Sequence, residues 1–213
     1  MLPNQSSSPT RRADAERNRG KILAAARSAF ADPEAEVSMA EVSRRAGVGM
    51  ATLYRNFPGR RELLEALFVD EVNTVCEAAQ RLEAETPGAL LMAWLHQFFA
   101  FINAKRHVGA ELLKNYDAGD PFFNDNRGRV LAAGRPLFAA AQRSHEVRAD
   151  LTLDQILDMV GAVATIRGDP DYLEPILQTT LDGLRPWPAR SEKDPAGTQL
   201  TGSESGSNLL LWS

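Results

Sequence analysis

The residues best placed for recognition chemistry form a short run at positions 50–56, Met-Ala-Thr-Leu-Tyr-Arg-Asn. On a helix that turns about 100° per residue, Ala51 and Arg55 share one outward face and Leu53 points the opposite way. Small and polar tips on such a face can meet base edges in a major groove, and polar flanks can bond phosphates. The candidates for base contact are Met50, Ala51, Thr52 and Arg55, and those for phosphate contact are Thr52, Tyr54 and Asn56.

A second short helix and a tight turn must position this run. Ser38 followed by Glu41 is a capping-box pattern, so a helix is expected to start at Met39. Gly47 is expected to end it in a left-handed conformation, with Val48 as the buried plug of the turn and Gly49 as the next N-cap. The inward anchors are Val42, Ala46, Leu53 and Phe57. The pattern is typical of a helix-turn-helix. An ordinary helical hairpin with a solvated face is the alternative.

The stretch 37–68 resembles the DNA-binding domain of the tetracycline-repressor (TetR/AcrR) family. The resemblance rests on Ala-Gly-Val at 46–48, Thr-Leu-Tyr at 52–54, and Phe-Pro at 57–58 followed by basic residues and Glu-Leu-Leu. It covers roughly residues 15–70. Two positions depart from the family pattern: Gly49 and Gly59 each replace a residue whose polar side chain would cap the next helix.

The resemblance implies an all-α fold with a three-helix DNA-binding head, a connecting fourth helix, and a helical domain that binds an effector and dimerises. Arg60 stands where the family usually has a phosphate-binding Lys. Arg17, near the start of the first helix, is a further candidate for contact with the DNA backbone. The full set of DNA-binding candidates is Arg17, Ser38, Met50, Ala51, Thr52, Tyr54, Arg55, Asn56 and Arg60.

Charge is distributed unevenly along the chain. The 213 residues carry a net charge of −4, but residues 1–61 hold 11 basic and 6 acidic side chains, and the remainder holds 13 and 22. A basic end joined to an acidic body suits a protein that binds double-stranded DNA. Chance clustering on a solvated surface is the alternative.

The remaining composition points to a cytoplasmic globular protein. Cys76 is the only cysteine, so an internal disulfide framework is excluded and a reducing compartment fits. The N-terminal residues lack the apolar core of a secretory signal. The uncharged apolar run at residues 89–103 is too short to span a membrane.

Apolar periodicity and breaker residues predict the other helices and the domains. Helices are expected at 14–31, 60–85, 87–105, 108–116, 122–141, 153–166 and from 170 onward. Pro136 is expected to kink or interrupt its helix. The predicted domains are a flexible basic arm (1–13), a helix-turn-helix domain (14–58), a ligand-binding and dimerisation domain (59–187) and a disordered tail (188–213).

Aromatic side chains and methionine are concentrated in the predicted ligand-binding and dimerisation domain. They indicate a pocket for a small apolar or amphipathic effector, although aromatic residues at helical spacing also suit a plain core. His96 and His107 are eleven residues apart, but the break expected near Lys105 and the lack of a third ligand argue against a metal site. The ligand-binding candidates are Trp94, Phe98, Phe101, His107, Tyr116, Phe123, Phe138 and Met159.

The last two helices are expected to form a homodimer interface. Gly161, Ala162 and Ala164 would allow close approach of a second copy, and the alternative is that both apolar stripes complete the monomer core. A dimer of this family is expected to bind a palindromic operator.

Sequence motifs for catalysis are missing. The chain has no His-Glu-x-x-His, no phosphate loop and no Gly-x-Ser-x-Gly, so neither enzymatic activity nor a cofactor is expected. The sequence favours a DNA-binding transcriptional regulator, a repressor released by its effector. The alternative is a small helical ligand-binding protein or enzyme whose helix-turn-helix is incidental.

Overall fold

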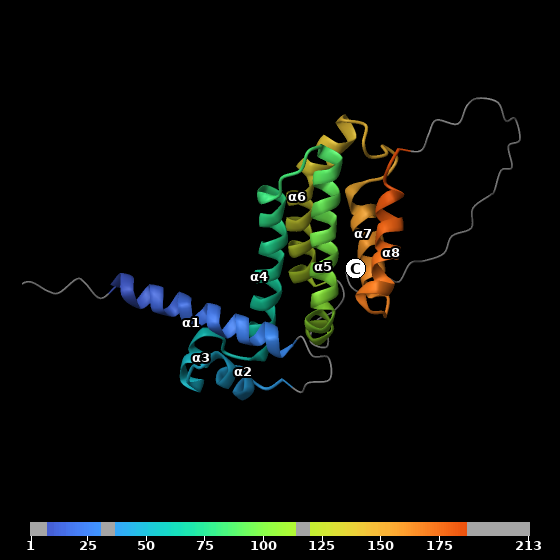
Figure 1. Cartoon of the computed structure of the whole chain (residues 1–213). Coiled ribbons are helices and arrows are strands. Elements are labelled where there is room, and N and C mark those ends of the chain that lie inside the picture. The colour runs from blue at the N-terminus through green and yellow to red at the C-terminus, as the bar shows by residue number, and fades with distance from the viewer. Residues whose placement is uncertain (1–7, 31–36, 114–119, 187–213) are drawn as a thin grey trace, which may run out of the picture. The chain divides into compact units, whose positions relative to one another are not determined.

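The computed structural model describes residues 8–30, 37–113 and 120–186. Over these ranges the chain folds into eight helices without a strand (Figure 1), which confirms the predicted all-α class. No helix in the described ranges is long and apolar enough to cross a membrane. The helices are α1 Ser8–Ala29, α2 Met39–Ala46, α3 Met50–Asn56, α4 Arg60–Arg81, α5 Pro87–Leu113, α6 Pro121–Arg143, α7 Leu153–Thr165 and α8 Pro170–Asp182.

The helices form two compact units. The head comprises the described residues up to Asn73 together with 104–113, and the body comprises 74–103 together with 120–186. α4 and α5 therefore contribute residues to both units. The predicted domain boundaries remain predictions, and the tail from 188 onward lies outside the described residues.

A small apolar core holds the head together. α1 packs against α2 and α3, and Ile22, Ala26, Leu53 and Leu67 are completely inaccessible to solvent. Burying each large aliphatic side chain contributes about 1.5–3 kcal/mol. Such a core can hold a helix as short as α3, which has only seven residues and would not be stable alone.

α1 differs at both ends from its prediction. It begins at Ser8 and ends at Ala29, rather than running from Asp14 to Ala31. Residues 8–13, predicted to belong to a flexible arm, are the first turns of this helix. Pro9 lies at its start, where the missing N–H costs nothing.

α5 is one continuous helix, so the predicted break near Lys105 is wrong. No proline stands between Ile102 and Leu112, and the buried stripe of the helix continues through Val108 to Leu112. His96 and His107 consequently lie on one helix, but no group of three or more metal-binding side chains occurs in the described residues.

α6 is helical through Pro136, so the predicted interruption does not occur. A proline deprives the carbonyl four residues earlier of its helical partner. Here that carbonyl belongs to Ala132, and both Ala132 and Pro136 are exposed. Solvent can therefore satisfy the carbonyl without ending the helix.

α7 and α8 are packed against each other, and both begin at the predicted positions, Leu153 and Pro170. Thr152 and Gln155 form a complete capping box before α7. Asp169 caps α8, whose first residue is Pro170. The buried stripe of α8 consists of Leu173, Leu177 and Leu181, each at most 3% exposed.

Candidate nucleic-acid interface and effector pocket

The turn between α2 and α3 is fixed by hydrogen bonds. Gly47 has φ +63° and its N–H donates to the carbonyls of Ser43 and Arg44, as a left-handed helix stop requires. Ser43 is buried, and its hydroxyl donates to the carbonyl of Val48 at 2.6 Å. Val48 is only half-buried, so the prediction that its side chain fills the interior of the turn is wrong. The buried Ser43 hydroxyl holds the turn instead.

Only one of the two hydrogen bonds of the capping box predicted for α2 is formed. The Ser38 hydroxyl accepts the Glu41 N–H at 3.2 Å, but the Glu41 carboxylate accepts hydrogen bonds from Arg44 and Arg45 instead. These two guanidinium groups lower the pKa of Glu41 to about 2. Its charge therefore persists through the physiological pH range and fades only as the pH falls toward 2.

The buried and exposed faces of α3 are those that the sequence predicts. Leu53 is fully buried, and Phe57 just beyond the helix is 1% exposed. On the outer side Met50 is 38% and Tyr54 46% exposed. The remaining predicted contact residues follow this pattern: Ala51 and Arg55 are exposed, and Thr52 and Asn56 are half-buried.

Arg55 is partly held in place on α3. Its Nε donates to the carbonyl of Ala51 at 3.2 Å and its Nη2 to the hydroxyl of Thr52 at 3.0 Å. Asn56 donates its amide N–H to the Thr52 carbonyl at 2.8 Å. Arg55 and Thr52 therefore act as one unit on the exposed face.

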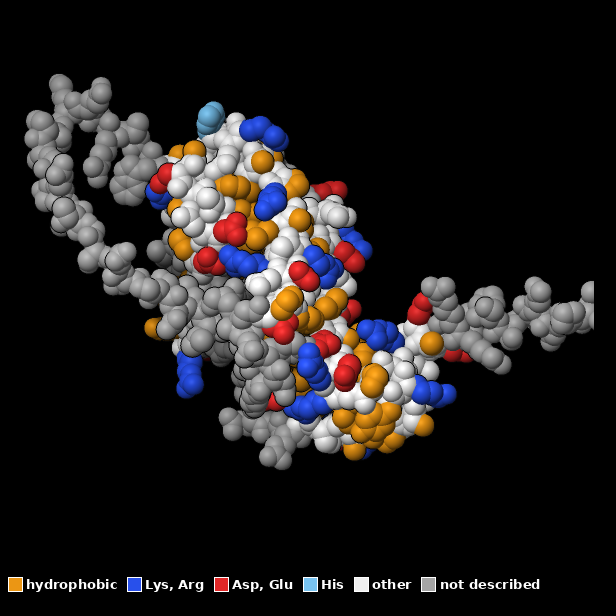
Figure 2. Space-filling view, turned by 180° about the vertical axis from the view of Figure 1, so that it is seen from behind, with side chains coloured by type: hydrophobic (Ala, Val, Ile, Leu, Met, Phe, Trp, Pro, Cys, Tyr) orange, Lys and Arg blue, Asp and Glu red, His pale blue; other side chains and the backbone are white. Residues whose placement is uncertain are grey.

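Most arginines of the head are paired with carboxylates. Arg17 pairs with Asp14, and Arg60 lies 3.3 Å from Glu111. On the face drawn in Figure 2, basic and acidic side chains are correspondingly interspersed. The other pairs are Arg27 with Asp70 and Glu71, Arg44 and Arg45 with Glu41, and Arg61 with Glu65.

Three basic side chains of the head, Arg19, Lys21 and Arg55, differ from these paired arginines. Within the described part of the head, none of them has a carboxylate at ion-pair distance. The Arg19 guanidinium lies 4.7 Å from the ring centroid of Phe57, a cation–π contact that orients it. Arg19 is exposed and lies beside the end of α3, because Phe57 is the C-cap of that helix.

Arg60 is more engaged than its predicted role implies. Besides Glu111, it donates to the carbonyl of Val37 and lies 5.0 Å from the ring centroid of Phe30. Contact with a phosphate would require at least part of this arrangement to open. Arg17 would likewise have to exchange Asp14 for a phosphate.

Four of the predicted ligand-binding residues are buried in the body. Trp94 is completely buried and its indole N–H donates to the Val75 carbonyl at 3.1 Å. Its ring stacks on Phe98 with centroids 6.2 Å apart, and Phe98 in turn contacts Phe101. Phe123 is also buried, at 6% exposure. Phe138 and Met159 are half-buried, whereas Tyr116 and the side chain of His107 lie outside the described residues.

A glycine on α6 makes room for the Trp94 ring. A Cβ atom on Gly134 would collide with the Cη2, Cζ3 and Cζ2 atoms of Trp94. The close approach of α5 and α6 at this point therefore depends on a residue without a side chain.

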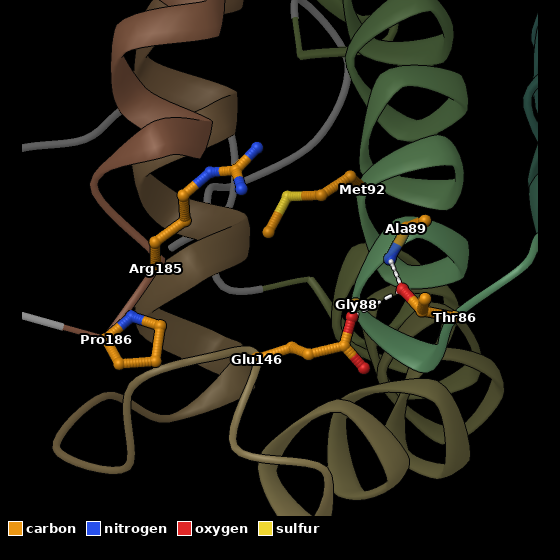
Figure 3. Close-up of a pocket in the computed structure, with 7 residues that line it drawn as sticks. All are labelled: Thr86, Gly88, Ala89, Met92, Glu146, Arg185 and Pro186. Atoms are coloured by element: carbon orange, nitrogen blue, oxygen red, sulfur yellow. Dashed lines mark hydrogen bonds between the residues drawn. The ribbon is translucent and has the colours of Figure 1, made fainter.

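A pocket of about 310 Å³ lies elsewhere in the body (Figure 3). None of the predicted ligand-binding residues whose side chains the structure describes lines it. Glu146 in its wall accepts hydrogen bonds from the hydroxyls of Thr86 and Ser144, and these lower the pKa of its carboxyl. The lining residues are Thr86, Gly88, Ala89, Met92, Glu146, Arg185 and Pro186.

Cys76 is half-buried with a free thiol. Burial raises the pKa of this thiol, an effect that Arg129 partly offsets. A thiol with a raised pKa is a poor nucleophile, so the surroundings of Cys76 suit a packing residue.

Two family profiles match the chain. Residues 22–67 match the bacterial regulatory proteins of the tetR family, and residues 86–186 match the C-terminal domain of SbtR-like transcriptional regulators. No curated protein sequence matches the chain.

Solved structures show the same relationship. A TetR transcriptional regulator from Streptomyces coelicolor is 33% identical with a TM-score of 0.65, over 79% of this chain and 98% of that one. A TetR regulatory protein from Mycobacterium vanbaalenii is 32% identical, also with a TM-score of 0.65, over 82% and 98%. The FadR regulator of Bacillus subtilis, solved with stearoyl-CoA, shares the fold at 15% identity, with a TM-score of 0.56 over 78% and 97%.

Proposed function

The chain belongs to the TetR family of DNA-binding transcriptional regulators, and we propose that it is a dimeric repressor that a small effector releases from DNA. The comparisons give no support to the alternative of a carrier or enzyme with an incidental helix-turn-helix. A regulator of bacterial genes would work in the cytoplasm, and we expect it to have no catalytic activity.

The observation that carries this proposal is the exposed face of α3. Met50, Ala51, Tyr54 and Arg55 are exposed, while Leu53 and the capping residue Phe57 fix the helix from inside. A helix presented in this way can enter a major groove with its first turns toward the bases. In our proposal Met50, Ala51, Thr52 and Arg55 contact bases, and Tyr54 and Asn56 bond phosphates.

Arg19 is the additional phosphate contact that we infer from the charges of the head. It has no carboxylate partner in the described residues, and the ring of Phe57 holds its guanidinium at the end of α3. A pre-oriented guanidinium loses little freedom when it binds a phosphate. Ser38, Arg17 and Arg60 stay candidates, but the two arginines would first have to loosen internal contacts.

Two heads must act together if the operator is palindromic. We propose that α7 and α8 pair with their copies in a second chain, which gives a two-fold symmetric molecule. Ile166, just after α7, and Tyr172 on α8 are 36% and 59% exposed, and burying them against a copy would be favourable. Two recognition helices could then enter major grooves about 34–36 Å apart.

Release would follow from a change in the separation of the two heads. In this mechanism an effector in the body favours a dimer shape in which both α3 helices cannot enter their grooves at once. A small apolar or amphipathic effector suits a body rich in aromatic side chains. The operator affinity then falls by the free energy with which the effector prefers the released shape.

A salt series with duplex DNA tests the proposed function. The full chain is mixed with a random-sequence duplex at several salt concentrations, and the dissociation constant is measured by fluorescence anisotropy. Phosphate contacts predict that affinity falls steeply as salt rises. Absence of binding at low salt, or binding that salt does not change, would contradict the proposal.

A further inference from the structure

The pocket at one end of the body is built from three separate segments. The start of α5 supplies Thr86 to Met92, the loop after α6 supplies Glu146, and the residues after α8 supply Arg185 and Pro186 (Figure 3). Its volume of about 310 Å³ is at the lower end of the range of small-molecule sites. It is separate from the aromatic residues of the core.

The walls of this pocket are tied to one another. The Arg148 N–H donates to the Leu184 carbonyl at 2.9 Å, which fastens the loop beside the residues after α8. The carboxylate of Glu146 fastens the same loop to the start of α5 by accepting a hydrogen bond from the Thr86 hydroxyl. A Cβ on Gly88 would lie 2.7 Å from Glu146, so this approach requires glycine.

The pocket carries one negative and one positive group that do not pair with each other. Glu146 accepts hydrogen bonds from the Thr86 and Ser144 hydroxyls, but no cationic side chain among the described residues neutralises it. Arg185 forms an ion pair with Asp182, in which its Nε lies 3.3 Å from the carboxylate. Its other nitrogens have no partner within the described chain.

An apolar wall lies between these two charges. Figure 3 shows the Met92 side chain extending from α5 toward Arg185, while the Glu146 carboxylate lies near Gly88 and Thr86 at the start of the helix. Ala89, Met92 and Pro186 supply apolar surface. The Ala89 N–H at the start of α5 is already bonded to the Thr86 hydroxyl, so it is not the feature that would attract a ligand.

We propose that this pocket binds a small zwitterion with an apolar part, of the chemical class of a free hydrophobic amino acid. The ammonium group would pair with Glu146, the carboxylate with Arg185, and the apolar part would cover Met92, Ala89 and Pro186. The inference rests on the proposed function, since it names the class of effector. An amine alone or a carboxylate alone would use only one of the two charges.

Isothermal titration calorimetry on the full chain without DNA tests this inference. The probes are L-phenylalanine, 2-phenylethylamine, which lacks the carboxylate, and 3-phenylpropanoate, which lacks the amine. Because both contacts are partly open to solvent, we expect each truncated probe to bind about fivefold to tenfold more weakly than phenylalanine. Equal binding of the three probes, or no heat with phenylalanine up to about 10 mM, a limit set by the weak end of small-ligand affinities, would overturn it.

Two variants locate the site. Arg185→Gln removes an exposed charge without touching the core, and it should reduce phenylalanine affinity to that of 2-phenylethylamine for the wild-type chain. Glu146→Gln should correspondingly remove the advantage of phenylalanine over 3-phenylpropanoate. Arg143→Gln, an exposed change at the end of α6, is the matched control and should bind like wild type. Unchanged affinity in Arg185→Gln would refute the assignment.

The outcome is separable from that of the proposed function. If the ligand-free chain binds duplex DNA in the salt series but ignores all three probes, only the zwitterion site is wrong. If it binds phenylalanine as described but never binds DNA, the regulatory function is wrong and the pocket stands as a binding site.

Discussion

At the scale of the residue, the arrangement of charge in the head decides which side chains can meet DNA. The head is basic by sequence, yet most of its arginines already neutralise its own carboxylates. Arg19, Lys21 and Arg55 have no carboxylate at ion-pair distance among the side chains that the structure describes, so they can meet a phosphate or a base without breaking such a pair. A count of basic residues therefore overstates the charge that is available to DNA.

Arg55 is expected to carry base preference. Arg55→Ala should cost about 1–3 kcal/mol for the preferred duplex and less for others, provided that Arg55 reads guanine. The measurement is competition binding with a panel of duplexes. Arg44→Ala, which removes an exposed arginine of α2 that pairs with Glu41, is the control. An unchanged sequence preference in Arg55→Ala would show that this side chain does not read bases.

Arg19 is expected to carry affinity without base preference. Arg19→Ala should weaken binding to every duplex and lower the slope of log affinity against log salt by about 1. Arg17→Ala removes an arginine two residues away that is paired with Asp14, and it should change the slope less. The opposite order of the two effects would mean that the ion pair of Arg17 opens on DNA and that Arg19 stays on Phe57.

The sequence predicts which side chains of α3 face outward, but it does not predict which residues pair with the arginines of the head. The exposure of Met50 and Tyr54 follows from their angle around α3 relative to Leu53. The pairing of Arg60 with Glu111 joins residues 51 apart in sequence, and no local spacing predicts such a contact. Ser43 was missed because a serine inside an amphipathic helix reads as a solvent-facing residue.

At the scale of the element, two glycines beside the turn make a matched pair. Gly47 has φ +63°, whereas Gly49 is extended at φ −71°, and a Cβ on either would meet nothing within 4 Å. Gly47→Ala should lower the free energy of unfolding by about 1–2 kcal/mol, because only the left-handed backbone opposes it. Gly49→Ser should raise it by a few tenths of a kcal/mol by capping α3.

Urea denaturation of both variants measures these changes. If Gly47→Ala is as stable as wild type, the left-handed stop is not required and the α2–α3 turn has another geometry. If Gly49→Ser destabilises the head, the N-cap assignment of α3 is wrong.

The contact between α5 and α6 allows a second pair of glycine variants to be compared. Gly134→Ala would push a methyl group into the Trp94 ring, and overpacking of this kind costs about 1–3 kcal/mol. Gly128→Ala lies on the same helix with nothing within 4 Å of its Cβ, and it should stabilise by up to about 1 kcal/mol through helix propensity. Thermal unfolding that gave both substitutions the same sign would contradict this packing.

The sequence predicted caps better than helix lengths. The start of α7 at Leu153, the start of α8 at Pro170 and the stop at Gly47 could be predicted because residues within four positions signal each of them. The continuity of α5 and of α6 was not predicted, because tertiary burial around Val108 and solvent access at Pro136 decide it, and neither is visible in a local window.

At the scale of the whole molecule, the proposed function requires a dimer. Sedimentation equilibrium at micromolar concentration should give twice the 23.3 kDa of one chain. Tyr172→Glu should shift the protein toward monomer, since it would bury a charge in the proposed α7–α8 interface. On a monomer surface a side chain that is 59% exposed would tolerate this change within about 0.5 kcal/mol.

The matched control is Glu174→Gln, a change on the same helix at a side chain that is also exposed. It should leave the mass unchanged. A single-chain mass for the wild-type protein would contradict the dimer and with it the two-fold operator.

Family membership could be predicted from about thirty residues around the helix-turn-helix, because that motif combines a cap, a turn glycine and buried anchors in one register. The effector could not be predicted in the same way. The aromatic residues chosen for it are largely core in the structure, and the open pocket is lined instead by residues from three distant segments, with Glu146 as its fixed carboxylate.

Selection of bound sequences from a random duplex pool tests the central claim most directly. If α3 reads a major groove in each half of a dimer, the enriched sites will be inverted repeats whose centres lie about one helical turn apart or a multiple of it, and Arg55→Ala will change the bases selected within each half. Failure to enrich any sequence, or enrichment of asymmetric sites that Arg55→Ala leaves unaltered, would contradict the account.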